Sequence, residues 1–380
     1  MEASRGGKSV REIARDTGWS ISNVHRWIQR ARGRRLDRVD FSDKPPGSRR
    51  AKTRTKDSTE RLVLSVRNEL RKKSALGEYG AHATRRELLK RGVPTPPSLR
   101  TIGRIFERHG ALDGNRRRRF APPPPGWYLP RAVGAFQELD SFDIIEGLVI
   151  KGGFRFEVLN AISLQGSLAA SWPCIDIVNT DKTIGCMIGH WKEFGLPLYA
   201  QFDNDTIFQG AQAHPDVVGR VIRMCLSLGV TPVFAPPRQV GFQAKIENYN
   251  GQWEDKVWAR FKHKTFLDML ARSDAYAAAK REHFRARIDT VPRRPFPTGW
   301  TLDLTRQIKG KIIYLRKTNN LGQAIVLGRA FTVDEEVHGR LVRAEVDLDE
   351  SKIRFYRLRR VDPANHELLR EVPYTLPNKG

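Results

Sequence analysis

Cysteine and long apolar segments are both scarce in this chain of 380 residues. Its three cysteines, Cys174, Cys186 and Cys225, are widely spaced, and no CxxC pair occurs. We therefore expect neither a disulfide framework nor a cysteine zinc site, and a reducing cytosol is the better expectation. No apolar run approaches the length of a membrane span, and the first residues lack the apolar stretch of a signal peptide. The sequence thus predicts a soluble cytoplasmic protein with no membrane partner.

Acidic residues are few relative to basic ones, and the imbalance is local. The chain has 67 Lys and Arg against 42 Asp and Glu, a net charge of +25, and residues 1–131 alone hold 33 basic against 13 acidic residues. A solubilising surface is the simplest alternative, but it seldom requires so uneven a distribution. Because the basic residues fall on compact helical segments, DNA or RNA is a better polyanion partner than a membrane surface.

Residues 1–32 have the pattern of a helix-turn-helix. Ser9 and Glu12 have the spacing of a capping box, and Gly18 interrupts the apolar pattern before a second helix that begins near Ser20. The apolar positions Val10, Ile13, Ala14, Ile21, Val24, Trp27 and Ile28 are expected inside. The opposite face of the second helix suits base edges and phosphates, through Ser22, Asn23, Arg26 and Arg30. An ordinary helical hairpin with a basic face is the alternative.

A basic linker, residues 33–57, precedes a second helical unit over residues 58–112. Ser98 is expected to cap its last helix, whose outer face offers Arg100, Thr101 and Arg104 to DNA. We interpret this unit as a winged-type helix-turn-helix, and a simple three-helix spacer is the alternative. The linker that follows, residues 113–131, combines four basic residues expected to hold phosphate with a stiff proline run. These basic residues are Arg116, Arg117, Arg118 and Arg119.

Residues 132–285 predict an α/β core of the ribonuclease H-like type with a mixed five-stranded sheet. Three antiparallel strands are followed by strands that alternate with helices. This order places Asp140 on the first strand, Asp203 at the end of the fourth, and Glu247 on the helix after the fifth. Asp143 is a nearby competitor of Asp140, and Asp205 of Asp203. Each acid could instead be an ordinary surface, turn or helix residue.

Carboxylates on strand ends and on a helix have rigid supports and suit hard divalent cations. Asp140, Asp203 and Glu247 are therefore candidate catalytic residues and ligands for two Mg²⁺ or Mn²⁺ ions. Such a pair serves phosphoryl transfer by activating the attacking oxygen and stabilising the leaving oxygen. His190 and His263 have no accompanying ligand spacing, so we interpret them as structural.

At these residues the chain resembles DDE transposases of bacterial insertion sequences, whose catalytic core is like that of retroviral integrases. Phe136 to Asp140 loosely match the family's W-Q-x-D block, and Asp203-Asn204 match D-N-G, with Asp205 where glycine is usual. Pro237 to Glu247 match the last block, with Ala244 in place of its glycine, and 43 residues separate the second and third acids. The resemblance implies that Lys245 contacts substrate phosphate.

Residues 300–376 contain short strand-like runs separated by glycines and acidic turns, which predict a small β-barrel. The runs are 312–315, 324–327, 341–346 and 353–356. A similar barrel follows the core in related transposases and contacts DNA or other subunits. Candidate DNA-contacting residues here are Arg316, Lys317, Arg343, Arg354, Arg357, Arg359 and Arg360.

The resemblance implies a bacterial, nucleoid-associated transposase. Its helical units would bind the ends of a mobile element as double-stranded DNA, and its core would cut and join DNA within a homo-oligomer. A catalytically inactive, domesticated DNA-binding regulator is the main alternative. A ribonuclease H-like nuclease without strand transfer is a further one, against which the two helical units argue.

Overall fold

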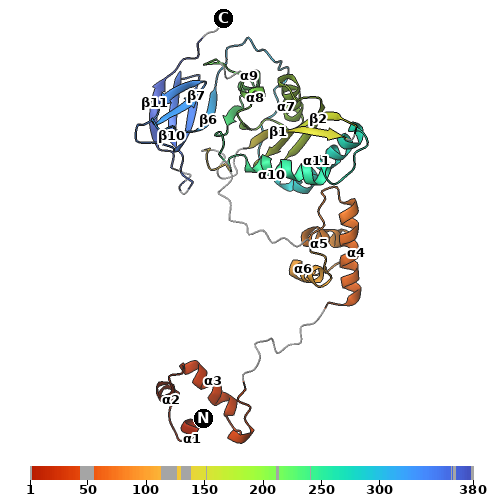
Figure 1. The fold of residues 1–380 in the computed structure, drawn as a ribbon, viewed down its shortest axis with the longest axis vertical. Helices are drawn as coiled ribbons and strands as arrows, with labels where there is room; N and C mark the ends of the chain where they lie inside the picture. The colour runs from red at the N-terminus through yellow and green to blue at the C-terminus, as the bar shows by residue number, and fades with distance from the viewer. Residues whose placement is uncertain are drawn as a thin grey trace. The chain divides into compact units, whose positions relative to one another are not determined.

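The structure, a computed structural model, describes residues 2–42, 55–112, 126–129, 138–150, 152–210, 214–239, 241–360, 362 and 365–377. The chain forms two compact units, residues 1–60 and 61–380 (Figure 1). None of the helices in these described ranges is long and apolar enough to cross a membrane. The basic run from Arg116 to Arg119 lies outside the described residues, so its expected phosphate contacts stay a prediction.

The first unit contains the two helices that the sequence predicts. α1 (Glu2–Arg5) precedes α2 (Val10–Thr17) and α3 (Ile21–Ala31), and a 3-10 turn, η1 (Leu36–Arg38), follows. Ser9 and Glu12 form the predicted capping box, Gly18 ends α2 at a φ of 69°, and the Ser20 side chain caps α3. Ile13, Ala14 and Val24 form the small core. Ile21 was expected inside but is 55% exposed, because α3 contributes Val24, nearly one turn further along the helix, to this core.

The second helical part consists of α4 (Asp57–Lys73), α5 (Ala81–Lys90) and α6 (Leu99–Arg108). Ser98 caps α6 as expected, by accepting a hydrogen bond from the Thr101 amide. Val63, Leu88 and Ile105 belong to the core that these helices share. Residues 55–112 contain no strand, so the expected wing is absent from this described segment. Three helices around one core agree with a helix-turn-helix and with the three-helix alternative.

The centre of the molecule is a mixed sheet with the strand order β3-β2-β1-β4-β5. β1 pairs antiparallel with β2, and β2 with β3, whereas β4 is parallel to both β1 and β5. The expected mixed sheet is therefore confirmed. The strand bounds are β1 (Leu139–Ile150), β2 (Phe154–Ser163), β3 (Ala169–Ile175), β4 (Tyr199–Phe202) and β5 (Thr231–Phe234).

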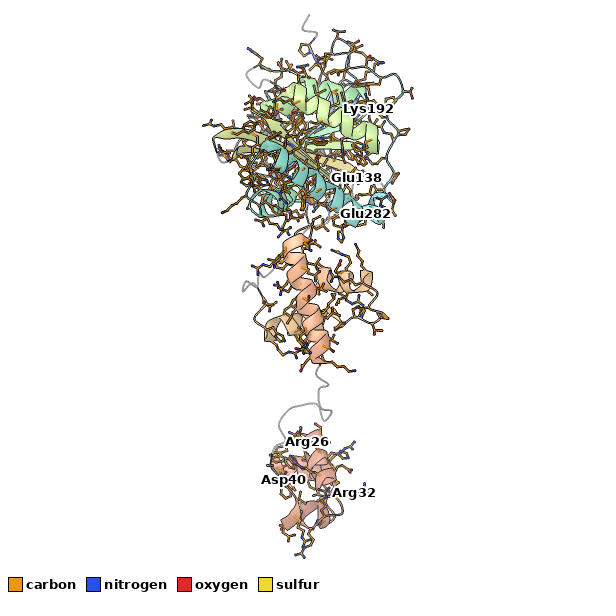
Figure 2. The ribbon with its side chains drawn as sticks, turned by 90° about the vertical axis from the view of Figure 1, so that its right-hand side faces the viewer. Arg26, Arg32, Asp40, Glu138, Lys192 and Glu282 are labelled. Atoms are coloured by element: carbon orange, nitrogen blue, oxygen red, sulfur yellow. The ribbon has the colours of Figure 1, made fainter. Side chains whose placement is uncertain are left out.

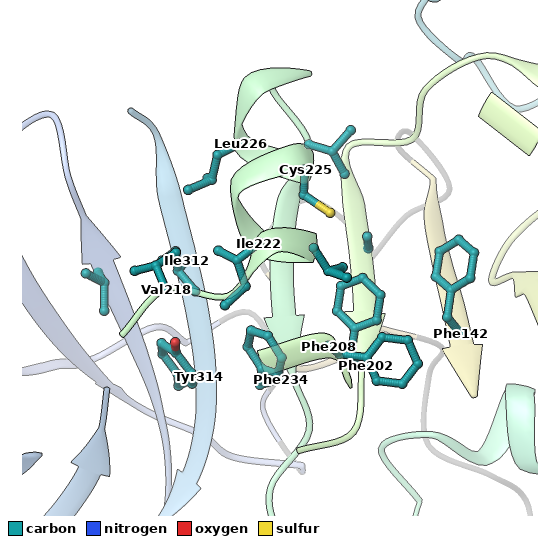
Figure 3. Close-up of a cluster of buried hydrophobic side chains, with 14 of the residues drawn as sticks. Phe142, Phe202, Phe208, Val218, Ile222, Cys225, Leu226, Phe234, Ile312 and Tyr314 are labelled. Carbon is teal, nitrogen blue, oxygen red and sulfur yellow. The ribbon is translucent and has the colours of Figure 1, made fainter. Parts of the chain in front are cut away.

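Helices cover both faces of this sheet. α7 (Thr180–Phe194) and α9 (Arg220–Ser227) pack on one face, with Phe142, Phe202 and Phe234 beneath them (Figure 3). α10 (Ala244–Trp253), the π-helical turn η2 (Glu254–Trp258) and α11 (Phe266–Ile288) cover the other face, where Ile145 and Val158 are buried. Neighbouring residues of a strand face opposite sides of the sheet. Positions of β1 that alternate with Phe142 therefore face α7 and α9, and those that alternate with Ile145 face α10 and α11.

The C-terminal strands continue the central sheet. β6 (Lys311–Lys317) runs parallel to β5, pairing Val233 with Ile313 and Phe234 with Tyr314, and the nine-stranded order runs on through β9 and β10 to β11. The predicted strands are observed, but the separate barrel is not: within the described residues β11 has only β10 as a neighbour. β6 pairs with the edge that β5 would otherwise expose. The remaining strands are β7 (Gln323–Val326), β8 (Arg329–Thr332), β9 (Leu341–Asp347), β10 (Lys352–Arg357) and β11 (Leu368–Pro373).

Candidate functional site

The two aspartates of β1 face opposite sides of the sheet. Asp140 faces α7, where the Trp191 indole Nε1 donates a hydrogen bond of 3.0 Å to its Oδ2. Asp143 faces α10, where the Asn250 side-chain amide donates to its Oδ2 at 2.7 Å. An odd number of residues along a strand reverses the side, so the two carboxylates cannot serve one site.

Asp140 is enclosed in a buried ion pair. Its side chain is 1% exposed, and the Arg293 guanidinium donates to Oδ1 at 2.9 Å and to Oδ2 at 2.5 Å. Burial alone would raise the pKa of Asp140, but Arg293 outweighs it and holds the pKa below its usual value. This geometry argues against the predicted role of Asp140 as a metal ligand, because Arg293 and Trp191 already neutralise and hydrogen-bond its carboxylate.

Asp143 and Asp203 lie at the same level of neighbouring parallel strands. β1 and β4 pair Asp140 with Ala200 and Ser141 with Gln201, and the same register continued by two residues places Asp143 beside Asp203. The Ser141 hydroxyl donates to the Gln201 side chain at 3.1 Å, which shows that these alternate positions share a face. Asp203 follows the last residue of β4, and its carboxylate is half-buried.

Glu247 enters the same region from α10. The helix is fixed to the sheet by its buried residues Ile246, Tyr249 and Trp253, which leaves Glu247 exposed in the first turn. Asn250, three residues further along, lies on a neighbouring position of the helix surface and holds Asp143. Glu247, Asn250 and Asp143 are thus linked through one helix face.

Asp143 lies within the electrostatic influence of the other two acids. Burial raises the pKa of Asp143 to about 6, with further contributions from the negative charges of Asp203 and Glu247. Burial also raises the pKa of Asp203, assisted by Asp205 and Glu146. Within the described part of the chain, no Lys or Arg forms an ion pair with Asp143, Asp203 or Glu247. A divalent cation bound by these carboxylates would reduce the repulsion between their negative charges, which no basic side chain offsets.

The described residues contain no group of three His, Cys, Asp or Glu side chains already close enough to hold a metal ion. The side chains would therefore have to move before all three acids could bind one metal ion. Asp143 and Asp203 lie on adjoining strands, and Glu247 lies on a separate helix. Carboxylate oxygens are nevertheless the ligands that Mg²⁺ and Mn²⁺ prefer. The residues fit these ions in chemistry and in their common face of the sheet.

Residues next to the acids have structural partners. The Asn204 amide donates to the Ala235 carbonyl at 2.7 Å and so ties the end of β4 to the end of β5. Asp205 caps the short helix α8 (Thr206–Gln209) by accepting from the Ile207 amide at 2.7 Å. This cap accounts for aspartate where the resembling family has glycine.

Lys245 points away from the acids. Its ammonium group donates to the Ser167 hydroxyl at 2.7 Å, and burial, then Arg287, lowers its pKa. This geometry gives no support to the predicted phosphate contact. His190 is buried against Asp140, and burial lowers its pKa to about 4, so it is neutral at pH 7. His263 is also buried, and its Nε2 lies 3.0 Å from the Val257 carbonyl oxygen, which agrees with a structural role.

Among the candidate DNA-contacting residues, Ser22, Asn23 and Arg26 are exposed on α3. Figure 2 labels Arg26. Arg30 instead donates to the Ser42 carbonyl at 3.0 Å and lies over Trp27, so part of its guanidinium holds the segment after α3. In the second helical part, Arg100 and Arg104 are exposed. Thr101 lies at the helix cap, where its hydroxyl is 2.9 Å from that of Ser98.

Two partners of the acids were missed in the sequence. Arg293 lies 153 residues from Asp140, and no local pattern marks their contact. Asn250 could have been found, because it follows Glu247 by three residues on a predicted helix and so lies on the same side of that helix.

Comparisons with known proteins found likeness in structure only. No family model and no curated protein matches the sequence. The catalytic core of BIV integrase is similar over 38% of this chain and 81% of that one, at 17% identity and a TM-score of 0.28. A chain of the simian T-cell lymphotropic virus intasome with PP2A subunit B56 gamma is similar over 68% and 84%, at 14% identity and 0.35. The HTLV-2 integrase core in complex with magnesium is similar over 43% and 88%, at 14% identity and 0.27. Likeness of this degree establishes neither the family nor the activity of the chain.

Proposed function

We propose that this protein is a metal-dependent DNA-cutting and DNA-joining enzyme, a transposase of the DDE type, with Asp143, Asp203 and Glu247 as its acidic residues. The observation that carries the proposal is the meeting of Asp143 and Asp203 at one level of two parallel strands, on the face that α10 covers with Glu247. The chain's net charge of +25 provides the attraction for DNA that such an enzyme requires.

Each part of the chain has a role in this proposal. Asp143, Asp203 and Glu247 would hold two Mg²⁺ or Mn²⁺ ions, which supply activation of the attacking oxygen and stabilisation of the leaving oxygen. Asn250 would orient Asp143 through its 2.7 Å hydrogen bond. The exposed basic and polar residues of α3 and α6 would recognise the ends of a bacterial mobile element, and joining two ends in concert would require a homo-oligomer on DNA.

A labelled fragment from an end of the DNA element that encodes the chain tests the proposal. Incubated with Mn²⁺ or Mg²⁺, the protein is expected to cut the fragment and join it to a target plasmid. Asp203→Asn and Glu247→Gln should each lower both steps by about 100-fold or more, since even outer partners of metal ligands contribute about 10–100-fold. Size-exclusion chromatography checks that the variants remain folded.

The inactive DNA-binding regulator remains the second candidate, because the described residues do not form a closed metal-ligand set. Tight binding of the end fragment, with no cutting or joining in either metal, would establish that candidate and overturn the enzyme. Cutting without joining would instead favour a nuclease.

A further inference from the structure

A pocket of about 530 Å³ lies between the ends of the central strands β4 and β5 and the C-terminal strands. Asn204, which directly follows Asp203, contributes to one wall, and Pro237, after β5, contributes to another. The end of β6 contributes Arg316 and Lys317. The pocket therefore reaches the residue that follows Asp203, although Asp203 itself does not line it, and two cations contribute to its lining.

Arg316 is a buried cation without an anionic partner. Its side chain is 7% exposed, and it donates to the carbonyl oxygens of Ile325 at 2.9 Å and Ala235 at 3.4 Å. The guanidinium carbon lies 4.8 Å from the centre of the Tyr314 ring. No carboxylate in the described ranges forms an ion pair with Arg316. Burial lowers its pKa to about 10, so it remains charged at neutral pH. A buried charge of this kind is stabilised when an anion binds.

Lys317 extends this positive charge to the surface. It is exposed and forms no ion pair with any residue that the structure describes. It also lines a second hollow of about 610 Å³, whose wall includes Arg340, Arg357 and Gln239. The two hollows share Lys317, so basic residues line both of them. Glu336 also lines the second hollow, and Glu367 forms ion pairs with Arg357 and Arg359 there.

We propose that the pocket beside Asn204 binds one unpaired nucleotide of the DNA strand next to the scissile phosphate. Its phosphate would lie on Arg316 and Lys317, and its base would lie among the side-chain amides of the lining. The volume falls in the range of small-ligand sites, about 300–1,000 Å³, which suits a single nucleotide and excludes a duplex. Phosphate contacts position DNA, and amide side chains pair with base edges. The identity of the polymer rests on the proposed function.

Photocrosslinking of full-length protein tests this site. Asp203→Asn protein, which should not cut DNA, is mixed with a 20-base-pair duplex that ends in a three-nucleotide overhang of 4-thiothymidine. A blunt duplex with the same base placed in a pair is the comparison. We expect the overhang to crosslink within residues 204–209 or 316–328, and the blunt duplex not to crosslink there.

Two charge reversals near opposite ends of β6 provide matched variants. Lys317→Glu should lower the overhang crosslink by about 5-fold or more and reduce the salt dependence of binding by about one phosphate contact. Lys309→Glu makes the same charge change before the start of β6, a strand about 20 Å long that ends at Lys317, and should leave the crosslink unchanged. Crosslinks elsewhere, equal crosslinking of the blunt duplex, or equal effects of the two variants would overturn the proposal. Because no cleavage is required, loss of this site and failure of the enzyme proposal give different results.

Discussion

Asp140 and Asp143 are the same kind of residue on the same strand, yet their surroundings give them opposite chemistry. Arg293 holds the pKa of Asp140 below its usual value, whereas burial and the neighbouring acids raise the pKa of Asp143 to about 6. The first carboxylate is neutralised within the fold, and the second is left with a negative neighbour. We therefore expect Asp140 to contribute to stability and Asp143 to contribute to activity.

Replacing Asp140 tests its stabilising role. Asp140→Asn would leave the Arg293 guanidinium buried without its counter-charge, which typically costs about 3–5 kcal/mol. The free energy of unfolding, measured in urea, should fall by this amount. Asp143→Asn on the opposite face is the matched control and should cost little or even stabilise the protein, since it removes a repelling charge. A loss below about 1 kcal/mol for Asp140→Asn would contradict the assignment.

His190 makes the stability depend on pH. Burial lowers its pKa to about 4 in the folded chain, below the usual value of about 6.5. The unfolded chain therefore gains a proton as the pH falls through 6.5, whereas the folded chain does not until about pH 4. Its contribution to stability is complete above pH 6.5 and decreases between pH 6.5 and 4. Urea unfolding at pH 7 and pH 5 should show a larger loss for the wild type than for His190→Gln. Equal losses would show that another group governs acid unfolding.

The sequence identifies the acids but not the faces on which they lie. Strand alternation shows that Asp140 and Asp143 cannot share a site, but choosing between them requires knowing which face α10 covers. That depends on the parallel register of β1 and β4, which pairs residues 60 positions apart, such as Asp140 and Ala200. Local periodicity does not specify such a register, so the motif spacing favoured Asp140, whereas the geometry supports Asp143.

At the scale of elements, the helices and strands could be predicted, but the pairing of the C-terminal strands with the central sheet could not. α7, from Thr180 to Phe194, is one of the helices that were expected to alternate with the later strands. The expected C-terminal strands are present, yet β6 pairs with β5 rather than closing a barrel. The sequence of a strand indicates that it pairs with other strands but does not specify which ones, because the packing of the whole core determines the pairing of distant strands.

Removing the C-terminal strands tests whether they belong to the core. In a chain ending at residue 299, the edge of β5 would be exposed and Phe234 would lose the Tyr314 ring that stacks on it at 5.2 Å. We expect this fragment to aggregate or to be degraded rapidly by protease. Deletion of residues 1–56, which precede α4, is the control and should leave a folded protein. A soluble, protease-resistant fragment without the C-terminal strands would show that they form an independent domain.

At the scale of the whole molecule, the large positive charge is not needed for the folding of the central core. Of the net charge of +25, an excess of 20 lies in residues 1–131, which include both helical parts. Under the proposed function, the central sheet with its acids would provide the chemistry, and the helical parts would choose the DNA. This division explains how a negative site can act on a negative polymer.

The affinity for DNA should therefore depend strongly on salt. Between 50 and 200 mM salt, the affinity should fall by about 10³-fold or more if several phosphates are contacted. Arg26→Ala, on the exposed face of α3, should weaken binding to the element end more than to unrelated DNA. Fluorescence anisotropy at several salt concentrations measures both effects. A salt-independent affinity would argue against binding through the basic surfaces.

Cutting of the labelled end fragment by two aspartate variants tests the central claim most directly. In Mn²⁺, Asp143→Asn should lose about 100-fold or more of the cutting rate while remaining folded. Asp205→Asn should retain most of the activity, because asparagine caps α8 as well as aspartate does. Wild-type activity in Asp143→Asn, or loss of activity only in Asp205→Asn, would contradict the assignment of Asp143, Asp203 and Glu247 as the acidic site.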